Sequence, residues 1–482
     1  MENPEPELAD VTRLARRLVN RAVEAARTPE RPLRRVLLDH LGKDAASLPT
    51  VSASWQPYDH VNVQMAVDAW LAASPVRQHE IVGVTGVGMM RHMDVSIADL
   101  VMSTREGLGR AGAGGVITTA LPCGPGGQTQ ACVSNGIYLV HDADVPLAIM
   151  LQPSDRGPMH AEVVLQIVGA DIRRMEAVLD EIRRFAAERS VFRGQVITLE
   201  PEVFGLARQA RVIGFLPRPA VDRSQIVLPD GLLEEIERQV IGIGRHSSRL
   251  LASGQHLRRG VLLHGAPGTG KTHTVSYLLS QLPDVTAIAI SGRALGLIAQ
   301  ACSVARALQP AVIVVEDVDL IAEERTMGRP GEHPLLFQLL NEMEGLNSGD
   351  DVTFLLTSNR AELLEPALTA RPGRVDLAAE LPLPDAAARR QLIGLYQGNL
   401  VLEVSSLDTI IERTDGVTAP FLKELLRRAA LLAAESDDRG DTLDVADNTP
   451  IRVTDEHLTA ALDELLDSRS KLTRVLLGAA QE

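Results

Sequence analysis

The sequence has few cysteines and no long apolar run, and each absence excludes a class of protein. Its 482 residues include three scattered cysteines, which give no disulfide framework and fit a reducing cytoplasm. No uninterrupted apolar stretch approaches the roughly 18 residues that a membrane helix needs. The first residues, Met1 to Glu7, are acidic and lack the apolar segment of a secretory signal. We therefore expect a soluble, cytoplasmic protein that has no membrane partner.

Lysine is also scarce, and acidic residues outnumber basic ones. Apart from histidine, every basic residue is arginine except Lys43, Lys271, Lys423 and Lys471, a preference typical of GC-rich bacterial genomes. A lysine kept in such a sequence marks a position where lysine chemistry matters, because the two side chains are not interchangeable. The formal net charge of −15 argues against nucleic acid as the partner, since phosphate contacts call for a basic surface.

The chain is too long for one hydrophobic core, and its patterns divide it into three regions. Residues 1–220 begin with helical periodicity and continue as an α+β pattern, with strands expected at 137–140, 147–151, 163–168, 195–199 and 212–215. Residues 221–383 carry short apolar strands separated by helical segments, which predicts a buried parallel sheet in an α/β domain. Residues 384–482 are almost wholly helical in pattern and are expected to form a separate lid.

The strongest chemical signal is a glycine-rich loop that directly follows an expected strand over residues 260–264. Glycines let the main chain curl so that N–H groups point at phosphate oxygens, and the next helix presents its positive dipole end. Lys271 is predicted to reach the β- and γ-phosphates of ATP, and Thr272 to give its hydroxyl to Mg²⁺. A purely structural turn is the alternative, but the complete spacing and the rare lysine favour nucleotide. The expected ATP-binding residues are Gly265, Ala266, Pro267, Gly268, Thr269, Gly270, Lys271, Thr272 and His273.

Two carboxylates end the apolar strand over residues 312–315. One carboxylate can hold the water shell of Mg²⁺ while the other polarises an attacking water. The usual order is Asp then Glu, and here it is reversed, so position assigns the metal role to Glu316 and the base role to Asp317. Because Asp is shorter than Glu, either a water chain intervenes or the main chain lies closer to the phosphate.

Polar residues after the next strand complete the expected site. Asn359 ends the strand over residues 352–358 and is predicted to hold the attacking water near the γ-phosphate. Arg371 and Arg374 flank a Pro-Gly turn, where they are poorly placed to serve their own subunit and well placed to enter a neighbour's site. There they would stabilise transition-state charge in trans. The alternative for both arginines is a solvated surface position.

These motifs together resemble an AAA ATPase module between about residue 221 and residue 470. The Glu–Asp order and the segments at 228–231 and 259–263 are closer to Bcs-type AAA proteins than to proteasomal ones. The resemblance implies a P-loop NTPase fold with a helical lid and Mg-dependent ATP hydrolysis. It also implies a ring, usually a hexamer, that binds ATP at subunit interfaces and performs mechanical work on a macromolecule.

Several segments of the sequence differ from the AAA pattern, and the differences limit which kind of AAA protein is expected. The segment over residues 291–299, where the family carries an aromatic pore loop, is short and contains no aromatic residue. The lid segment at 416–421 replaces the family's usual sequence, so its adenine contact is not assigned. The sequence has neither the His-Glu-x-x-His motif of the zinc-protease subfamily nor a tyrosine near its C-terminus of the kind that docks proteasomal ATPases.

The expected function is therefore an ATP-driven homo-hexameric motor that remodels or disassembles a protein client, without threading it past aromatic pore loops. An ATP-controlled assembly switch or scaffold is the alternative, and the missing pore aromatic favours it. A nucleic-acid remodeller is a third reading, which the acidic charge disfavours. The sequence identifies neither the client nor the fold of the N-terminal region.

Overall fold

The computed structural model divides into two compact units, each described by itself. It describes residues 32–42, 44–85, 96–102, 111–155, 161–199, 213–320, 334–364, 375–437 and 450–466. The first unit takes the described residues up to 191, and the second takes residues 192–199 and those from 214 onward. The sequence pattern predicts an N-terminal region that extends to residue 220.

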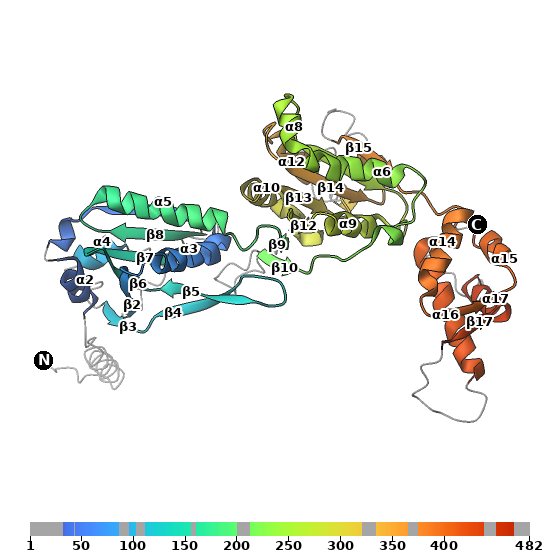
Figure 1. The fold of residues 1–482 in the computed structure, drawn as a ribbon, viewed down its shortest axis with the longest axis horizontal. Coiled ribbons are helices and arrows are strands. Elements are labelled where there is room, and N and C mark those ends of the chain that lie inside the picture. Colours follow the sequence, from blue (N-terminus) through green and yellow to red (C-terminus); the bar gives the residue numbers. More distant parts are fainter. Residues whose placement is uncertain are drawn as a thin grey trace, which may run out of the picture. The chain divides into compact units, whose positions relative to one another are not determined.

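The first unit is built on a six-stranded antiparallel sheet that carries helices on both faces (Figure 1). In sheet order the strands are β1 (Thr50–Trp55), β8 (Ala161–Val168), β7 (Val145–Asp155), β6 (Ile137–Asp142), β2 (Gln78–Thr85) and β3 (Gly112–Gly114). Helices α3 (His60–Ala72) and α5 (Ile172–Glu188) bury their apolar stripes, including Trp70 and Ile182, on one face. Helices α2 (Leu33–Leu41) and α4 (Ile97–Met102) cover the other face. A separate hairpin pairs β4 (Ile117–Pro122) with β5 (Thr129–Asn135).

The second unit contains a seven-stranded sheet whose central strands are parallel and mostly apolar. In sheet order its strands are β10 (Ile213–Leu216), β9 (Val196–Leu199), β12 (Thr286–Ile290), β13 (Ala311–Val315), β14 (Val352–Ser358), β11 (Arg259–His264) and β15 (Leu377–Glu380). Every residue of β13 is buried, as expected for a strand covered on both faces. Because β14 lies between β13 and β11, the carboxyl ends of these three strands meet at one edge of the sheet.

Helices cover both faces of this sheet. Helices α6 (Leu232–Glu237) and α9 (Lys271–Ser280) pack on the face that Val312 and Val314 share with Leu263. The alternate residues of β13 point to the opposite face, where α10 (Ile298–Ala307) contacts β12, β13 and α12 (Pro334–Glu344). Between α6 and β11 the chain forms a π-helical turn (Arg238–Gly242), α7 (Ile243–Arg245) and α8 (Ser247–Ala252). Two 3₁₀ segments, Arg223–Gln225 and Gly292–Leu297, complete the domain.

Strands β9 and β10 belong to this second sheet, and β9 pairs in parallel with β12. The strands predicted at 195–199 and 212–215 are present in the structure, but they lie outside the N-terminal region to which their sequence position assigned them. Apolar alternation identifies a strand without identifying its partner, so the pattern alone could not assign either strand to a sheet.

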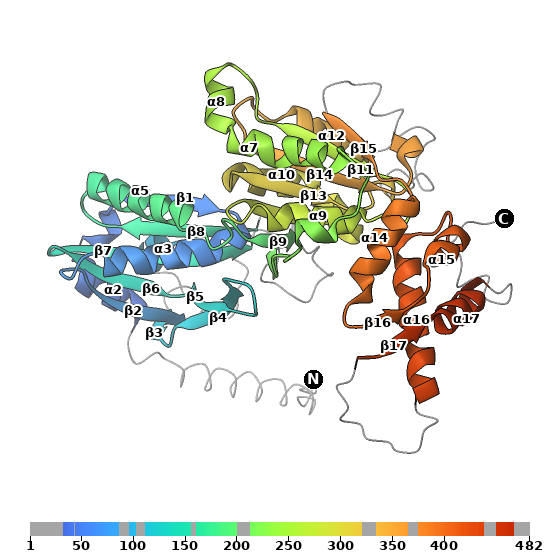
Figure 2. The ribbon, with the colours of Figure 1, turned by 45° about the vertical axis from the view of Figure 1, so that its right-hand side comes forward.

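A helical subdomain follows at the C-terminal side (Figure 2). Its helices are α14 (Ala386–Gln397), α15 (Asp408–Arg413), α16 (Ala419–Asp437) and α17 (Asp455–Leu466), packed around a core that includes Phe421 and Leu462. The helical expectation missed one feature, a short parallel pair formed by β16 (Val401–Glu403) and β17 (Arg452–Thr454). The buried Arg389 donates to the carbonyl oxygen of Pro384 and to the carboxylate of Asp415, which ties the entry of the lid to the loop before α16.

Candidate active site

The glycine-rich loop joins β11 to α9 at the carboxyl edge of the second sheet. Gly265 has φ 143°, and a Cβ built there would lie 2.3 Å from the carbonyl oxygen of Leu381, so only glycine fits. Gly270 precedes the helix with φ 98°, in the left-handed region that other residues disfavour. The loop therefore turns the chain sharply and leaves the first N–H groups of α9 directed at the space above it.

Lys271 is held inside this loop. The residue is 7% exposed, and Nζ donates to the carbonyl oxygens of Gly265 at 2.8 Å and Ala266 at 2.9 Å. Burial lowers the pKa of Lys271, while the carboxylates of Asp317 and Asp319 act in the opposite direction. The ammonium group thus lies where a loop that cradles phosphate needs a positive charge, with acidic side chains of the next motif close by.

Asp317 and Asn359, expected from separate motifs, are in direct contact. The Asn359 Nδ2 donates to Oδ1 of Asp317 at 3.0 Å. Asp317 follows β13 and Asn359 follows β14, so strand order brings the two side chains together. Glu316 is anchored through its main chain, whose N–H donates to the carbonyl oxygen of Ile290 at 3.1 Å.

Asp319 supports the contact between Asp317 and Asn359 by binding the end of β14. The sequence motif assigned no role to this residue. It is 5% exposed, and its Oδ1 accepts hydrogen bonds from the Ser358 hydroxyl at 3.0 Å and from the Asn359 N–H at 3.1 Å. The end of β14 is therefore locked to the loop after β13 by a buried carboxylate. The acidic run after β13 was a signal that could have found this residue, but its partners lie about 40 residues away.

The lid also contacts the glycine-rich loop. A Cβ built on Gly268 would lie 3.1 Å from Cβ of Thr418 and 3.3 Å from Cδ of Pro420. Thr418 is buried and stands immediately before α16, so the segment at 416–421 that departs from the family pattern lies against the loop. No local sequence signal indicated this contact.

The other residues predicted for the site lie in α9, after β13 or outside the described residues. Thr272 and His273 lie exposed in the first turn of α9. The hydroxyl of Thr272 and the carboxylate of Glu316 are hard oxygen donors of the kind that Mg²⁺ prefers, so the donor set suits this ion. Arg371 and Arg374 lie outside the described residues, which resume at residue 375.

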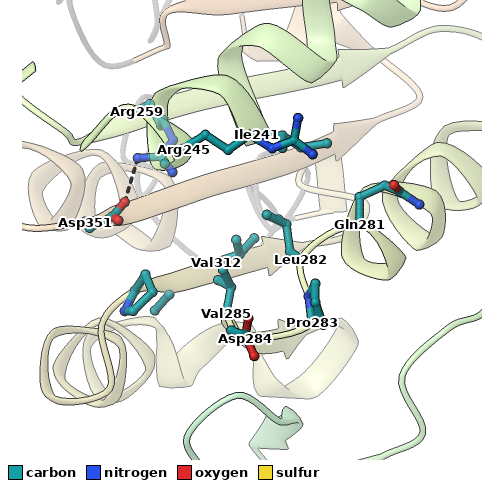
Figure 3. A pocket seen from close by; sticks show the side chains of 13 residues that line it. Ile241, Arg245, Arg259, Gln281, Leu282, Pro283, Asp284, Val285, Val312 and Asp351 are labelled. Carbon is teal, nitrogen blue, oxygen red and sulfur yellow. Dashed lines mark hydrogen bonds and ion pairs between the residues drawn. The ribbon is translucent and has the colours of Figure 1, made fainter. Parts of the chain in front are cut away.

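The pocket in Figure 3 is separate from this site. It has a volume of about 230 Å³ and is lined by Arg259 at the start of β11, by Ala311 at the start of β13 and by Asp351 just before β14. Arg259 and Asp351 form an ion pair at 2.8 Å. Because these residues mark the amino ends of the strands, the pocket lies at the opposite edge of the sheet from the glycine-rich loop.

Comparison with known proteins identifies the domain that carries the site. Residues 261–383 match the model of the family described as ATPase family associated with various cellular activities (AAA). The chain contains an AAA ATPase domain. The matched residues run from β11 to the start of the lid, and they include the glycine-rich loop, Asp317 and Asn359.

The chain is also similar in sequence to several known proteins. The chain is 28% identical over 288 residues to a proteasome-activating nucleotidase of Thermococcus onnurineus, covering 57% of this chain and 69% of the relative. It is 31% identical over 256 residues to the ATP-dependent zinc metalloprotease FtsH 2 of Sphaerobacter thermophilus, covering 50% and 37%. The human ATPase family gene 2 protein homolog A is 32% identical over 232 residues, covering 45% and 26%. The last two matches thus span well under half of the relative's length.

These findings confirm the expected fold class, a P-loop α/β domain with a helical lid after an α+β region. They also confirm the expectation of an ATP-binding AAA hydrolase. Among the residues that the structure describes, no helix is long and apolar enough to cross a bilayer.

Proposed function

We propose that this chain is a Mg-dependent, ATP-hydrolysing ring motor that remodels or disassembles a protein client. The observation that carries the proposal is the meeting of three motifs at one edge of the sheet. Lys271 begins α9 and its Nζ reaches back to the loop after β11, Asp317 follows β13, and Asn359 contacts Asp317 from the end of β14. Phosphate binding, water activation and water positioning are thereby gathered around one point.

Each residue has a defined task in this proposal. Lys271 and the N–H groups of the loop bind the β- and γ-phosphates, and Thr272 and Glu316 hold Mg²⁺, which neutralises charge on those phosphates. Asp317 accepts a proton from the attacking water. Meanwhile the water oxygen forms a bond to the γ-phosphorus, and the bond between the γ-phosphorus and the bridging β-phosphate oxygen breaks. Asn359 orients Asp317 and the water. The products are ADP and phosphate.

The N-terminal unit is proposed to hold the client. The AAA match begins at residue 261, so the antiparallel sheet of the first unit lies outside the family domain. Two of the similar proteins have names that refer to a proteasome and to proteolysis, which supports a protein as the client. The Glu316–Asp317 order supports a Bcs-type variant, and the arginine preference supports a bacterial source. The few cysteines support a cytoplasmic location.

Arg371 and Arg374 are proposed to act on the neighbouring subunit of a homo-hexamer. We expect Arg371→Ala and Arg374→Ala to lower turnover by about 10³-fold, because such an arginine stabilises transition-state charge in trans. ATP affinity should stay unchanged, since the ground-state site belongs to another subunit. ATP turnover and nucleotide titration measure the two effects. Arg390→Ala is the control, because Arg390 pairs with Asp408 on the lid surface and should not affect turnover.

Mixing tests the same proposal. An Arg371→Ala subunit combined with a Lys271→Ala subunit should regain some turnover, because mixed interfaces join an intact loop to an intact arginine. Full-rate hydrolysis by a dilute monomer would contradict the ring.

The segment at 291–297 bears on how the motor works. It forms a 3₁₀ turn directly after β12 and contains no aromatic residue. Aromatic rings grip many sequences because they offer large apolar contact area with little rotamer entropy to lose. We therefore propose local remodelling or disassembly through the N-terminal unit in place of processive threading. The same observation favours the second candidate, an ATP-controlled assembly switch.

We expect a stable fluorescent protein, fused to a client, to keep its fluorescence during ATP turnover. The client is first obtained by capture on the hydrolysis-deficient Asp317→Asn variant. Complete loss of fluorescence that Leu295→Ala abolishes would instead demonstrate threading. Client-stimulated ATPase activity separates the motor from the switch, because a switch hydrolyses ATP at a rate that the client does not raise.

A further inference from the structure

Asp317 has a main-chain conformation that L-residues disfavour. Its φ is 51°, in the left-handed region, where only glycine is common and Asp and Asn are the best tolerated of the others. Among the described residues other than glycine, Ala143 and Asp144 also have positive φ, and both lie in the tight turn between β6 and β7. Left-handed residues are usual in such a turn. Asp317 stands in no hairpin, so its conformation needs another cause.

Thr357 supplies the contacts that hold this conformation. Its Oγ1 accepts the N–H of Asp317 at 3.1 Å, and its carbonyl oxygen accepts the N–H of Val318 at 2.9 Å. Regular pairing between β13 and β14 ends at Val315, opposite Leu356. Just beyond it, one residue of β14 therefore fixes two consecutive N–H groups of the departing chain. Thr357 is 2% exposed, so water cannot replace its hydroxyl without a rearrangement.

The left-handed conformation of Asp317 compensates for the short side chain that the reversed order of the two acids places at the base position. The side chain of Asp is one methylene shorter than that of Glu, and a closer main chain is one of the two ways in which a base at this position can gain the missing reach. The carboxylate of Asp317 lies against Asn359 and close enough to Lys271 to influence its pKa, which places it at the phosphate-binding loop. A rotation at Asp317 would move the carboxylate away from both partners.

We propose that Thr357 is a positioning residue for ATP hydrolysis, which holds Asp317 in the left-handed conformation that lets a short carboxylate serve as the base. This inference rests on the proposed role of Asp317. The hydroxyl of Thr357 acts through the Asp317 main chain and touches no reacting atom. It is therefore needed for the rate of the chemical step and not for ATP binding.

The test compares two threonines of the same strand. Thr357→Val keeps the shape of the side chain and removes the hydroxyl, and we expect kcat to fall about 10- to 100-fold while KM for ATP changes little, since small misplacements are costly in catalysis. Thr357→Ser restores the acceptor and should recover most of the rate. Thr353→Val is the matched control, because Thr353 is also buried in β14 and its Oγ1 has no hydrogen-bond partner among the described residues. It should retain wild-type turnover.

A double variant separates positioning from general stability. In the Asp317→Asn background, Thr357→Val should cause no further loss, because its effect passes through the carboxylate already removed. Equal losses in both backgrounds, or wild-type kcat in Thr357→Val, would overturn the inference. If Thr357→Val does not fold, Thr357→Ala is measured in its place, since a smaller side chain needs no extra room. A failure of Asp317→Asn to slow turnover would instead overturn the proposed function itself.

Discussion

Replacing Lys271 with alanine is expected to abolish ATP binding. The ammonium group is the one cation placed inside the loop among the described residues, and its two carbonyl partners hold it there. Truncating one partner of a buried, hydrogen-bonded charge pair costs about 2–5 kcal/mol, which corresponds to roughly a 30- to 5,000-fold change in Kd. The N–H groups of the loop remain, but they cannot supply the lost charge.

Lys271→Arg is expected to lose ATP binding as well. Nζ fits between the carbonyl oxygens of Gly265 and Ala266, whereas a planar guanidinium is broader and presents its donors as a fork. Titration with a fluorescent ATP analogue measures both variants. Lys423→Ala is the control, because Lys423 lies on the exposed side of α16, 6.0 Å from the ring centroid of Tyr396, and should bind ATP normally. Near-normal affinity in Lys271→Ala would refute the assignment of the loop.

The parts of the site that could be predicted from the sequence are those encoded by contiguous residues. The glycine-rich loop was recognisable because its spacing, the preceding strand and the rare lysine all lie within a short segment. The expectation that Asp317 and Asn359 serve one site agrees with the rule that parallel strands end at one edge of a sheet. In both cases, local sequence and a general rule of topology were sufficient.

Contacts between distant segments could not be predicted in this way. The guanidinium of Arg218 donates to the carbonyl oxygens of Gly194, Leu279, Leu282 and Val285, which ties the turn before β9 to the end of α9 and the loop that follows it. A main-chain carbonyl has no identity in the sequence, so no pattern reveals this clamp. The contacts of Thr357 and Thr418 have no sequence signature for the same reason, since their partners are main-chain or glycine atoms of other segments.

The conformation of Asp317 resolved a question that the sequence left open. The reversed acids allowed either an intervening water chain or a closer main chain. The left-handed φ of 51° and the contact with Asn359 favour the second, because they direct the carboxylate by a turn of the main chain. Dihedral angles of single residues depend on tertiary contacts, here those of Thr357, and so lie beyond what residue types alone indicate.

Asp317→Asn is expected to lower turnover by about 10²-fold or more while ATP and Mg²⁺ stay bound. The structure indicates that this substitution keeps the main-chain conformation of residue 317 and its contact with Asn359. Asparagine tolerates the left-handed conformation as well as aspartate does, and its amide oxygen can still accept the Asn359 Nδ2–H. The variant therefore removes the basicity of the side chain and little else. It should accumulate bound ATP, which also makes it suitable for capturing a client.

Glu316→Gln should instead weaken Mg²⁺-dependent ATP binding, because its position assigns Glu316 to the metal. An amide is a weaker ligand than a carboxylate for a hard cation, so ATP affinity should fall in the presence of Mg²⁺ and change little without it. Measuring Kd for ATP with and without Mg²⁺, together with single-turnover rates, distinguishes the two variants. Asp408→Asn serves as the control, since that exposed carboxylate pairs with Arg390 on the lid surface. If Glu316→Gln traps ATP and Asp317→Asn loses the Mg²⁺ dependence, the roles of the two acids must be exchanged, and Thr357 would then hold a metal ligand instead of the base.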